Sequence, residues 1–277
     1  MHALPTLTAL RYIQPLREGG SLPAIVDTDD GLYVVKFRGA GQGPKALIAE
    51  IVVGSMARAL GLDAPDLAAV DLLPSFGTGE PDPEIQDLLR ASHGINVGLR
   101  YLDGAFNFAL AAAGDLVTPE VAARIVWLDA FVLNPDRSHR NTNLLVHDRR
   151  VWLIDHGAAL YVHHDWPSAT PERARAPFPL VKDHVLLTHA QDLEAADVDC
   201  TARLPRAVLE DIMRRVPDGL LADRLLRGEF GSPDDARHRY VEFLAARLEA
   251  PRHFVTAAAE ARVVALAQPP VPVRARR

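Results

Sequence analysis

The segment 136–157 places the strongest constraint on how this chain can fold. Within it, two short apolar runs flank the polar residues 147–150, a pattern that predicts an antiparallel hairpin with a four-residue loop. The chain therefore enters and leaves the hairpin at one open end. Asp136 and Asn141 precede the first strand and Asp155 follows the second, so these polar side chains are expected to lie close together.

Two carboxylates and a carboxamide at one point suit phosphoryl transfer. That reaction needs Mg²⁺ on the phosphate oxygens, a positioned acceptor hydroxyl and stabilised charge, but little covalent chemistry from the protein. Mg²⁺ prefers oxygen ligands and is usually held by one or two carboxylates together with the substrate phosphates. Asp155 and the side-chain oxygen of Asn141 supply such ligands, which leaves Asp136 to accept the hydroxyl proton. The alternative interpretation is an ordinary surface hairpin that ends in an aspartate.

Asn143 competes with Asn141 as the metal ligand, since it also lies near the open end of the hairpin. Opposite Ile154 it would point to the face away from Asp155, because side chains alternate along a strand. Asn141 precedes the strand and is free to turn inward. We therefore favour Asn141 and keep Asn143 as the alternative.

A second predicted hairpin carries a lysine that is a candidate phosphate ligand. The apolar runs 23–27 and 32–37 flank the turn sequence Thr-Asp-Asp-Gly, which is typical of a hairpin. Alternation then puts Lys36 on the same face as Leu32 and Val34. A lysine at such a position either protects the edge of a sheet or contacts a phosphate.

Glu50 lies inside a predicted helix that follows this hairpin. Pro44 suits the first turn, apolar residues recur at helical spacing, and Gly61 suits the end of the helix. A carboxylate between Ala49 and an isoleucine needs a cationic partner. Lys36 is the obvious candidate.

Glycine-rich turns occur on both sides of the lysine hairpin. The first turn contains Gly19, Gly20 and Ser21, and backbone N–H groups in such a turn could approach phosphates. A turn of this kind is a weak signal alone, but its position directly before the hairpin strengthens it. We interpret the second, residues 39–44, as a connection that starts the next helix rather than as a phosphate cradle.

Taken in order, these pieces resemble the HipA-like kinases. The resemblance covers about residues 15 to 165, and its motifs are specific as an ordered set rather than singly. Two of them are also similar to motifs of the phosphoinositide kinases, in the same protein-kinase-like superfamily. The pieces are the glycine turn, Val-Val-Lys36-Phe, the Glu50 helix, Asn134-Pro-Asp136-Arg-Ser-His-Arg-Asn141 and Ile154-Asp155-His-Gly.

The resemblance implies a fold and a set of site residues. The fold is α+β and bilobal, like that of protein kinases, with a small β-rich N-lobe containing one main helix and a larger, mostly helical C-lobe. Asp136 is the implied catalytic base, and Lys36 pairs with Glu50 and contacts the nucleotide phosphates. Asn141 and Asp155 would hold Mg²⁺. The implied nucleotide-binding residues are Gly19, Gly20, Ser21, Lys36, Leu99 and Tyr101.

The chain also departs from the family pattern. Its first glycine turn lacks the fuller Gly-x-Gln-x-Lys sequence of the HipA toxins, and His156 stands where many kinases carry an aromatic residue. These departures leave the phosphate loop and any loop-based self-regulation open. Arg137 and His139 either contact the transferring phosphate or are solvated or structural residues.

The function implied by the resemblance is that of an ATP- and Mg²⁺-dependent kinase that phosphorylates a Ser/Thr hydroxyl of a protein. One alternative is a small-molecule or lipid kinase, because aminoglycoside and phosphoinositide kinases use a similar triad. Another is a nucleotide-binding pseudokinase or scaffold, against which the presence of all the catalytic residues argues. The sequence names neither the acceptor nor an antitoxin-like or regulatory partner.

Composition narrows the class of protein. The net charge of −6 argues against direct binding of nucleic acid. A single cysteine, Cys200, fits a reducing compartment. No apolar run reaches the roughly 18 residues of a membrane span, and the first residues show no signal-peptide pattern. We therefore expect a cytoplasmic protein without a membrane partner.

Changes of pattern along the chain predict its organisation. We expect a kinase-like N-lobe at residues 1–102, a helical C-lobe at 103–266 and a disordered tail at 267–277. The apolar stretch 97–102 resembles the strand that joins kinase lobes and against which adenine lies.

Within the second part, a helix is predicted to start at Thr118-Pro119 and to end at Asn134-Pro135, which delivers Asp136 to a loop. From Pro205 onward the pattern is almost wholly helical. His163 and His164 cluster beside an aspartate, and we assign them to the loop after the metal-binding aspartate rather than to a transition-metal site.

Overall fold

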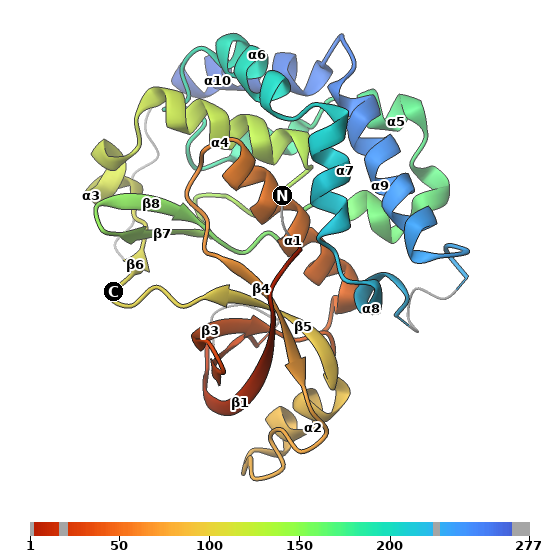
Figure 1. Ribbon diagram of the computed structural model, residues 1–277. Coiled ribbons are helices and arrows are strands. Elements are labelled where there is room, and N and C mark those ends of the chain that lie inside the picture. Colours follow the sequence, from red (N-terminus) through yellow and green to blue (C-terminus); the bar gives the residue numbers. More distant parts are fainter. Residues whose placement is uncertain (1–2, 17–21, 224–227, 268–277) are drawn as a thin grey trace.

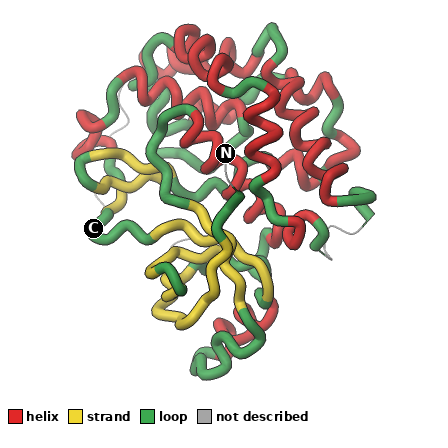
Figure 2. The backbone as a smooth tube through the Cα atoms, viewed as in Figure 1, coloured by secondary structure: helices red, strands yellow, loops and turns green. Residues whose placement is uncertain are grey.

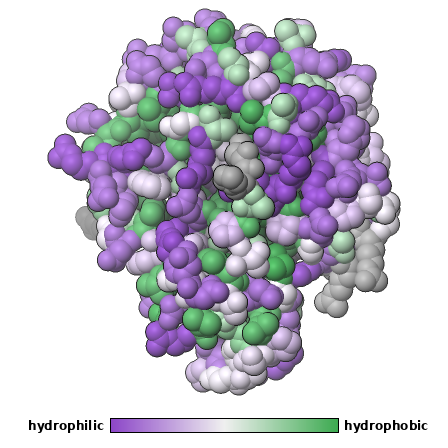
Figure 3. Space-filling view, viewed as in Figure 1, coloured by the Kyte–Doolittle hydropathy of each residue, from purple (hydrophilic) through white to green (hydrophobic). Residues whose placement is uncertain are grey.

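The computed structural model describes residues 3–16, 22–223 and 228–267 and shows a mixed α+β chain (Figure 1). Strands dominate the N-terminal part and helices the C-terminal part (Figure 2). On the face viewed in these figures, polar residues cover most of the helical part, and apolar residues are interspersed toward the barrel end (Figure 3). The α+β class predicted from the sequence is confirmed. The division into two lobes at residue 102 stays a prediction.

Five strands of the N-terminal part close into a barrel. Their order is β1-β2-β3-β5-β4, and β4 closes the barrel by pairing in parallel with β1. The other neighbouring pairs are antiparallel. The strands are β1 (Thr6–Pro15), β2 (Ala24–Thr28), β3 (Gly31–Lys36), β4 (Leu67–Leu72) and β5 (Gly94–Arg100).

Alternation along β3 separates the barrel interior from the functional face. Tyr33 and Val35 are buried in an apolar cluster inside the barrel. Lys36 lies between Val35 and Phe37 of this cluster and therefore points to the outer face. The predicted hairpin of β2 and β3 is confirmed, with Thr28 paired to Gly31.

The helix that carries Glu50, α1 (Gly43–Ala59), lies against this outer face. Pro44 occupies its first turn, and Gly61 follows its C-cap with a φ of +74°. The Gly61 N–H donates to the Arg58 carbonyl at 3.0 Å and the Leu62 N–H to the Ala57 carbonyl at 2.9 Å, which is the Schellman arrangement. The helix predicted from the sequence is therefore confirmed at both ends.

Burial of α1 is nearly complete. It packs against β5 on one side and against helices of the C-terminal part on the other, and most of its residues are buried. A helix that is apolar all round belongs in a core. The larger apolar core accordingly runs without a break from α1 into the C-terminal helices, while a smaller one fills the barrel.

The remaining elements comprise a short sheet and the other helices of the described residues. The sheet has the order β6-β7-β8, with β6 (Phe106–Asn107), β7 (Leu144–His147) and β8 (Arg150–Leu153). The α-helices are α2 (Pro83–Ala91), α3 (Leu110–Ala113), α4 (Pro119–Phe131), α5 (Pro171–Arg175), α6 (Leu193–Arg203), α7 (Arg206–Arg214), α8 (Asp218–Leu221), α9 (Pro233–Leu248) and α10 (His253–Ala267). Short 3₁₀ helices span Gly114–Leu116, Tyr161–His164, Trp166–Ser168 and Pro179–Asp183.

Sequence patterns predicted α4 and the helices after Pro205, but not α5 or α6. In α6 only Leu193, Ala196 and Cys200 are buried, so its apolar stripe is too sparse to recognise. None of the helices in the described residues is long and apolar enough to cross a membrane.

The hairpin of β7 and β8 differs from its prediction in one respect. Val146 faces Val151 as the four-residue loop requires, but His147 also pairs with Arg150. The turn therefore contains only two residues, 148 and 149, which have φ values of +50° and +59° and suit a type I′ turn. The predicted loop length is wrong because polar side chains at 147 and 150 do not prevent their backbones from pairing.

The packing of the barrel interior predicts the effect of filling its glycine. A Cβ at Gly98 would lie 2.7 Å from Val70 Cγ2 and 3.1 Å from Tyr33 Cδ1, so Gly98→Ala should lower the free energy of unfolding by about 1–3 kcal/mol. Gly41→Ala is the matched control, because a Cβ there has no neighbour within 4 Å. It should change stability by less than about 0.5 kcal/mol. Urea unfolding of both variants tests this, and equal effects would contradict it.

Candidate active site

Lys36 connects the barrel, α1 and the β7–β8 hairpin. Its Nζ donates to Glu50 of α1 and to Asp155, which follows β8. The ammonium is buried, as is Glu50, whereas 37% of the Asp155 side chain is exposed. The pairing of Lys36 with Glu50 predicted from the sequence is confirmed, and the structure adds Asp155 as a second partner.

The charges of this cluster support one another. Burial disfavours the ammonium of Lys36, but the attraction of Glu50 and Asp155 outweighs burial and raises its pKa. Burial also disfavours the Asp155 carboxylate, yet Lys36 overcomes this effect and lowers the pKa of Asp155. Burial raises the pKa of Glu50 against the pull of Lys36. Lys36 is therefore a charged group shared between two acids.

Gly157, two residues after Asp155, lies directly against α1. A Cβ at this position would lie 3.3 Å from Glu50 Oε1, which is a tight contact, and 3.5 Å from Ala46 Cβ, which is an ordinary one. The chain after Asp155 therefore passes close to the carboxylate that Lys36 binds.

Asp136 lies in the loop after α4. The Thr118 hydroxyl caps α4 by accepting the Val121 N–H at 3.3 Å. The Asp136 Oδ2 accepts hydrogen bonds from the Asn141 amide at 3.1 Å and from the Asn143 amide at 3.0 Å. Its Oδ1 accepts none from the residues that the structure describes, so one oxygen of this carboxylate stays open.

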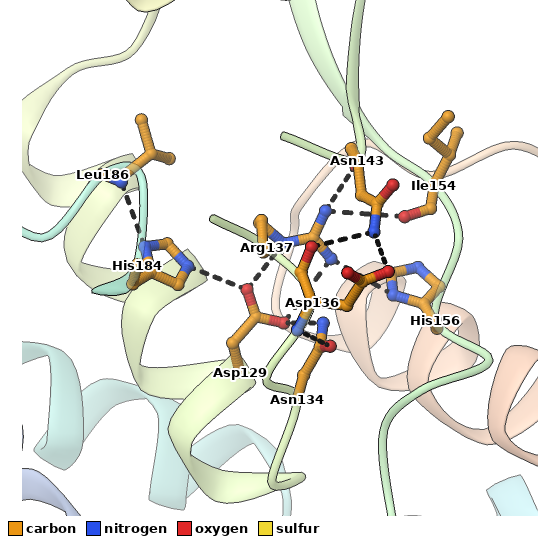
Figure 4. Close-up of polar contacts among 9 residues, drawn as sticks. All are labelled: Asp129, Asn134, Asp136, Arg137, Asn143, Ile154, His156, His184 and Leu186. Atoms are coloured by element: carbon orange, nitrogen blue, oxygen red, sulfur yellow. Dashed lines mark hydrogen bonds and ion pairs between the residues drawn. The ribbon is translucent and has the colours of Figure 1, made fainter. Parts of the chain in front are cut away.

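The structure corrects the reasoning about Asn143. Its φ is +48°, so it does not continue the extended strand and strand alternation does not set its direction. Its side chain turns toward Asp136, where the amide also donates to the backbone carbonyl at 3.1 Å (Figure 4). Asn143 is nearly buried, whereas Asn141 is exposed. Both asparagines contact the same carboxylate, and Asn143 is the more firmly held.

A buried polar network contacts the segments that carry Asp136 and Asn143 (Figure 4). Arg137 donates its Nε–H to Asp129 of α4 at 2.6 Å and an Nη2–H to His156 Nδ1 at 3.3 Å. The Leu186 N–H donates to His184 Nδ1, so the Nε2 of His184 carries the proton and donates to Asp129 at 2.9 Å. The network joins α4, both segments at the open end of the hairpin and the 184–186 segment.

Electrostatics keep this network in one protonation state. Burial disfavours the Asp129 carboxylate, but Arg137 and His184 outweigh burial and lower its pKa. Burial, followed by the nearby Arg137, lowers the pKa of His156 to about 3, so this ring stays neutral. Sequence patterns missed Asp129 and His184. The sequence did offer one signal for Asp129, because an acid between Leu128 and an alanine in an apolar helix needs a cationic partner. The same signal identified Glu50.

The predicted nucleotide-binding residues are only partly placed. Leu99 is buried in the larger core and Tyr101 is partly buried. The Tyr101 N–H already donates to the Leu32 carbonyl at 3.0 Å, so that backbone amide is engaged within the protein. The predicted loop residues Gly19, Gly20 and Ser21 lie outside the described residues.

Oxygen ligands are the donors that this site offers to a metal. Asp155 and Asn143 present a carboxylate and a carboxamide, which fit Mg²⁺. No cluster of three or more His, Cys, Asp or Glu residues suited to a metal occurs in the ranges that the structure describes. His163 instead packs in the core, with its Nδ1 2.9 Å from the Tyr240 hydroxyl.

Comparison with known proteins agrees with this geometry. A family model described as HipA-like kinase matches residues 11–170. Among solved structures, the chain is similar to the crystal structure of a Helicobacter pylori proinflammatory kinase, CtkA, with a TM-score of 0.52 and 12% identity over 96% of this chain and 100% of that one. At this identity the likeness concerns the fold alone. No curated protein matches the chain.

The buried position of His184 predicts a dependence of stability on pH. Burial lowers its pKa despite Asp129, so the folded chain takes up the His184 proton at a lower pH than the unfolded chain, which binds it below about pH 6.5. The free energy of unfolding should therefore fall with pH below that value, by up to about 1.4 kcal/mol per pH unit. In His184→Gln this contribution should disappear. Urea unfolding of both proteins between pH 5 and 7 tests it, and a stability difference independent of pH would contradict it.

Proposed function

The chain belongs to the HipA-like kinase family, and from that premise we propose that this kinase-type phosphotransferase moves the γ-phosphoryl group of ATP, with Mg²⁺, to a Ser/Thr hydroxyl of a protein. We also propose that residues 1–102 and 103–266 act as two lobes with the nucleotide between them. Direct contact with nucleic acid forms no part of this function.

The observation that carries the proposal is the contact of Lys36 with both Glu50 and Asp155. In kinases a strand lysine that pairs with a helix glutamate binds the nucleotide phosphates, and an aspartate beside it holds the metal. Here the three groups come from three different elements that the chain folds onto one point. A lysine with a raised pKa stays charged at neutral pH, as phosphate binding requires.

Metal binding is proposed for Asp155 and one asparagine. Asp155 has an exposed part, and the side-chain oxygen of Asn143 accepts no hydrogen bond from the described residues. Because Asp136 holds the Asn143 amide nitrogen at two points, that oxygen is oriented in advance. We therefore favour Asn143 over Asn141, the reverse of the preference based on sequence. Bound Mg²⁺ would neutralise charge on the phosphate oxygens.

Asp136 is the proposed general base. Its Oδ2 is held by two asparagines while Oδ1 stays open, so the carboxylate is fixed in orientation and still free to accept a proton from the acceptor hydroxyl. Nucleotide binding is further proposed for Gly19, Gly20, Ser21, Leu99 and Tyr101. The protein acceptor is supported by membership of the family.

Removing the base should abolish transfer without removing nucleotide binding. Asp136→Asn should lower the rate of phosphoryl transfer from labelled ATP by about 10²–10⁴-fold, while Mg·ATP still raises the melting temperature. Asp148→Asn makes the same change on the exposed turn of the hairpin and should behave like the wild type. Analysis of the labelled products separates protein, lipid and small-molecule acceptors. A wild-type chain that binds no ATP would refute the proposal.

The two asparagines can be distinguished by their metal requirement. Asn143→Ala should raise the Mg²⁺ concentration for half-maximal transfer by at least about 10-fold, because it removes a ligand. Asn141→Ala should have a smaller effect, since it removes only one hydrogen bond to Asp136. Titration of the transfer rate with Mg²⁺ tests this, and the opposite order would restore Asn141 as the ligand.

A further inference from the structure

Arg137 is buried so completely that its guanidinium has no contact with water. Each of its nitrogens nevertheless has partners: Nε and Nη2 donate to the two oxygens of Asp129, Nη2 also donates to His156, and Nη1 donates to two backbone carbonyls. All five N–H groups of an arginine can be accounted for in this way. A side chain used to this extent has a specific role in holding its neighbours.

The two carbonyls belong to the segments that carry the proposed metal ligands. One is the carbonyl of Asn143 itself, and the other, at 3.5 Å, is that of Ile154, the residue directly before Asp155. The same guanidinium also contacts the ring of His156, directly after Asp155. Arg137 therefore holds the backbone at Asn143 and just before Asp155, and it holds the ring of the residue just after Asp155.

Backbone conformation shows why such fastening is needed. Asn143 has a φ of +48° and Asp155 a φ of +53°, in the left-handed region that few residues other than glycine adopt, although Asn and Asp tolerate it better than most. Conformations of this kind persist when the surrounding structure holds them. A backbone hydrogen bond from the Ile154 N–H to the Asn143 carbonyl, at 3.1 Å, links the two segments to each other.

We propose that Arg137 is a positioning residue that sets metal affinity: by holding the Asn143 and Ile154 carbonyls, it keeps Asn143 and Asp155 in the left-handed conformations that direct both side chains to one metal. This inference rests on the proposed function. Arg137 acts on the metal ligands indirectly, through the Asn143 and Ile154 carbonyls and the His156 ring. Its own position is fixed by Asp129, which α4 presents from the other side.

Lysine cannot replace arginine in this role. A guanidinium offers five donors in a rigid plane, whereas an ammonium is a point charge with three donors around one atom. A lysine at position 137 would keep the ion pair with Asp129 but would not reach Asn143, Ile154 and His156 together. Arg137→Lys therefore keeps the positive charge but removes the planar group with five donors.

A matched control exists in the same part of the fold. Arg247 is equally buried and donates to backbone carbonyls, among them Ala130 and Phe131 at the end of α4. Among the described residues, Arg247 has no contact with the open end of the β7–β8 hairpin. Arg247→Lys should therefore lower stability without altering the metal site.

The test compares the two variants in three measurements. Binding of a non-hydrolysable ATP analogue in EDTA measures the contact of Lys36 with the phosphates when no metal is bound. Titration of the protein–analogue complex with Mn²⁺, followed by electron paramagnetic resonance, reports metal affinity. Hydrogen exchange of the Ile154 amide measures how firmly the open end of the β7–β8 hairpin is held, and it needs no ligand. Arg137→Lys should weaken Mn²⁺ binding about 10–100-fold and speed exchange at Ile154, with metal-free analogue binding unchanged. Arg247→Lys should lower only the melting temperature.

Other outcomes decide against the inference. If Arg137→Lys lowers the melting temperature but leaves Mn²⁺ affinity and Ile154 exchange as in the wild type, the residue is merely structural. If Arg137→Lys does not fold, Asp129→Asn, which keeps the arginine but weakens its anchor, must weaken Mn²⁺ binding, and normal affinity in that variant overturns the proposal. A wild-type chain that does not bind the analogue refutes the proposed function instead. In that case, faster exchange of the Ile154 amide in Arg137→Lys than in the wild type still shows whether Arg137 holds the open end of the hairpin.

Discussion

The buried ion pair of Asp129 and Arg137 is the interaction on which the rest of the site depends. Removing two charges from water is costly, and the attraction between them compensates only when every remaining donor and acceptor is satisfied. Here the carboxylate accepts hydrogen bonds from Arg137, Asn134 and His184, while the guanidinium reaches beyond it to the hairpin. The pair thus ties the loop that carries Asp136 to α4 through Asp129 and to the hairpin through the guanidinium.

A second ion pair meets the same segment of the chain. Lys36 extends from the barrel to Asp155, and Arg137 lies beneath the next residue, His156. The acidic motif is thus held between two cations, one contributed by the strands and one by the loop after α4. This explains why residues separated by about a hundred positions must fold together before any of them has a function. Burial is the main reason why the pKa of His156 is lowered and the ring stays neutral, and the two neighbouring cations add to it.

Local patterns predicted much of this arrangement. Apolar alternation and helical spacing identified both hairpins and α1, and an isolated acid in an apolar helix correctly indicated the Lys36 partner. Alternation cannot encode a change of backbone conformation, which is why the reasoning about Asn143 failed. The length of the hairpin turn was wrong for another reason, because polar side chains at 147 and 150 do not prevent backbone pairing. Asp129 and His184 escaped notice because their partners come from distant segments. The engaged amide of Tyr101 likewise depends on a neighbouring strand that no local pattern reveals.

The near-complete enclosure of α1 has a consequence for control. In a two-state switch, an effector contributes typically about 1–3 kcal/mol of coupling. Swinging this helix outward would return Ile48, Ile51, Val52 and Met56, all fully buried, to water at about 1.5–3 kcal/mol each. Outward movement of α1 would therefore cost more than such an effector can supply. The ion pair of Lys36 with Glu50 is then a permanent part of the folded chain.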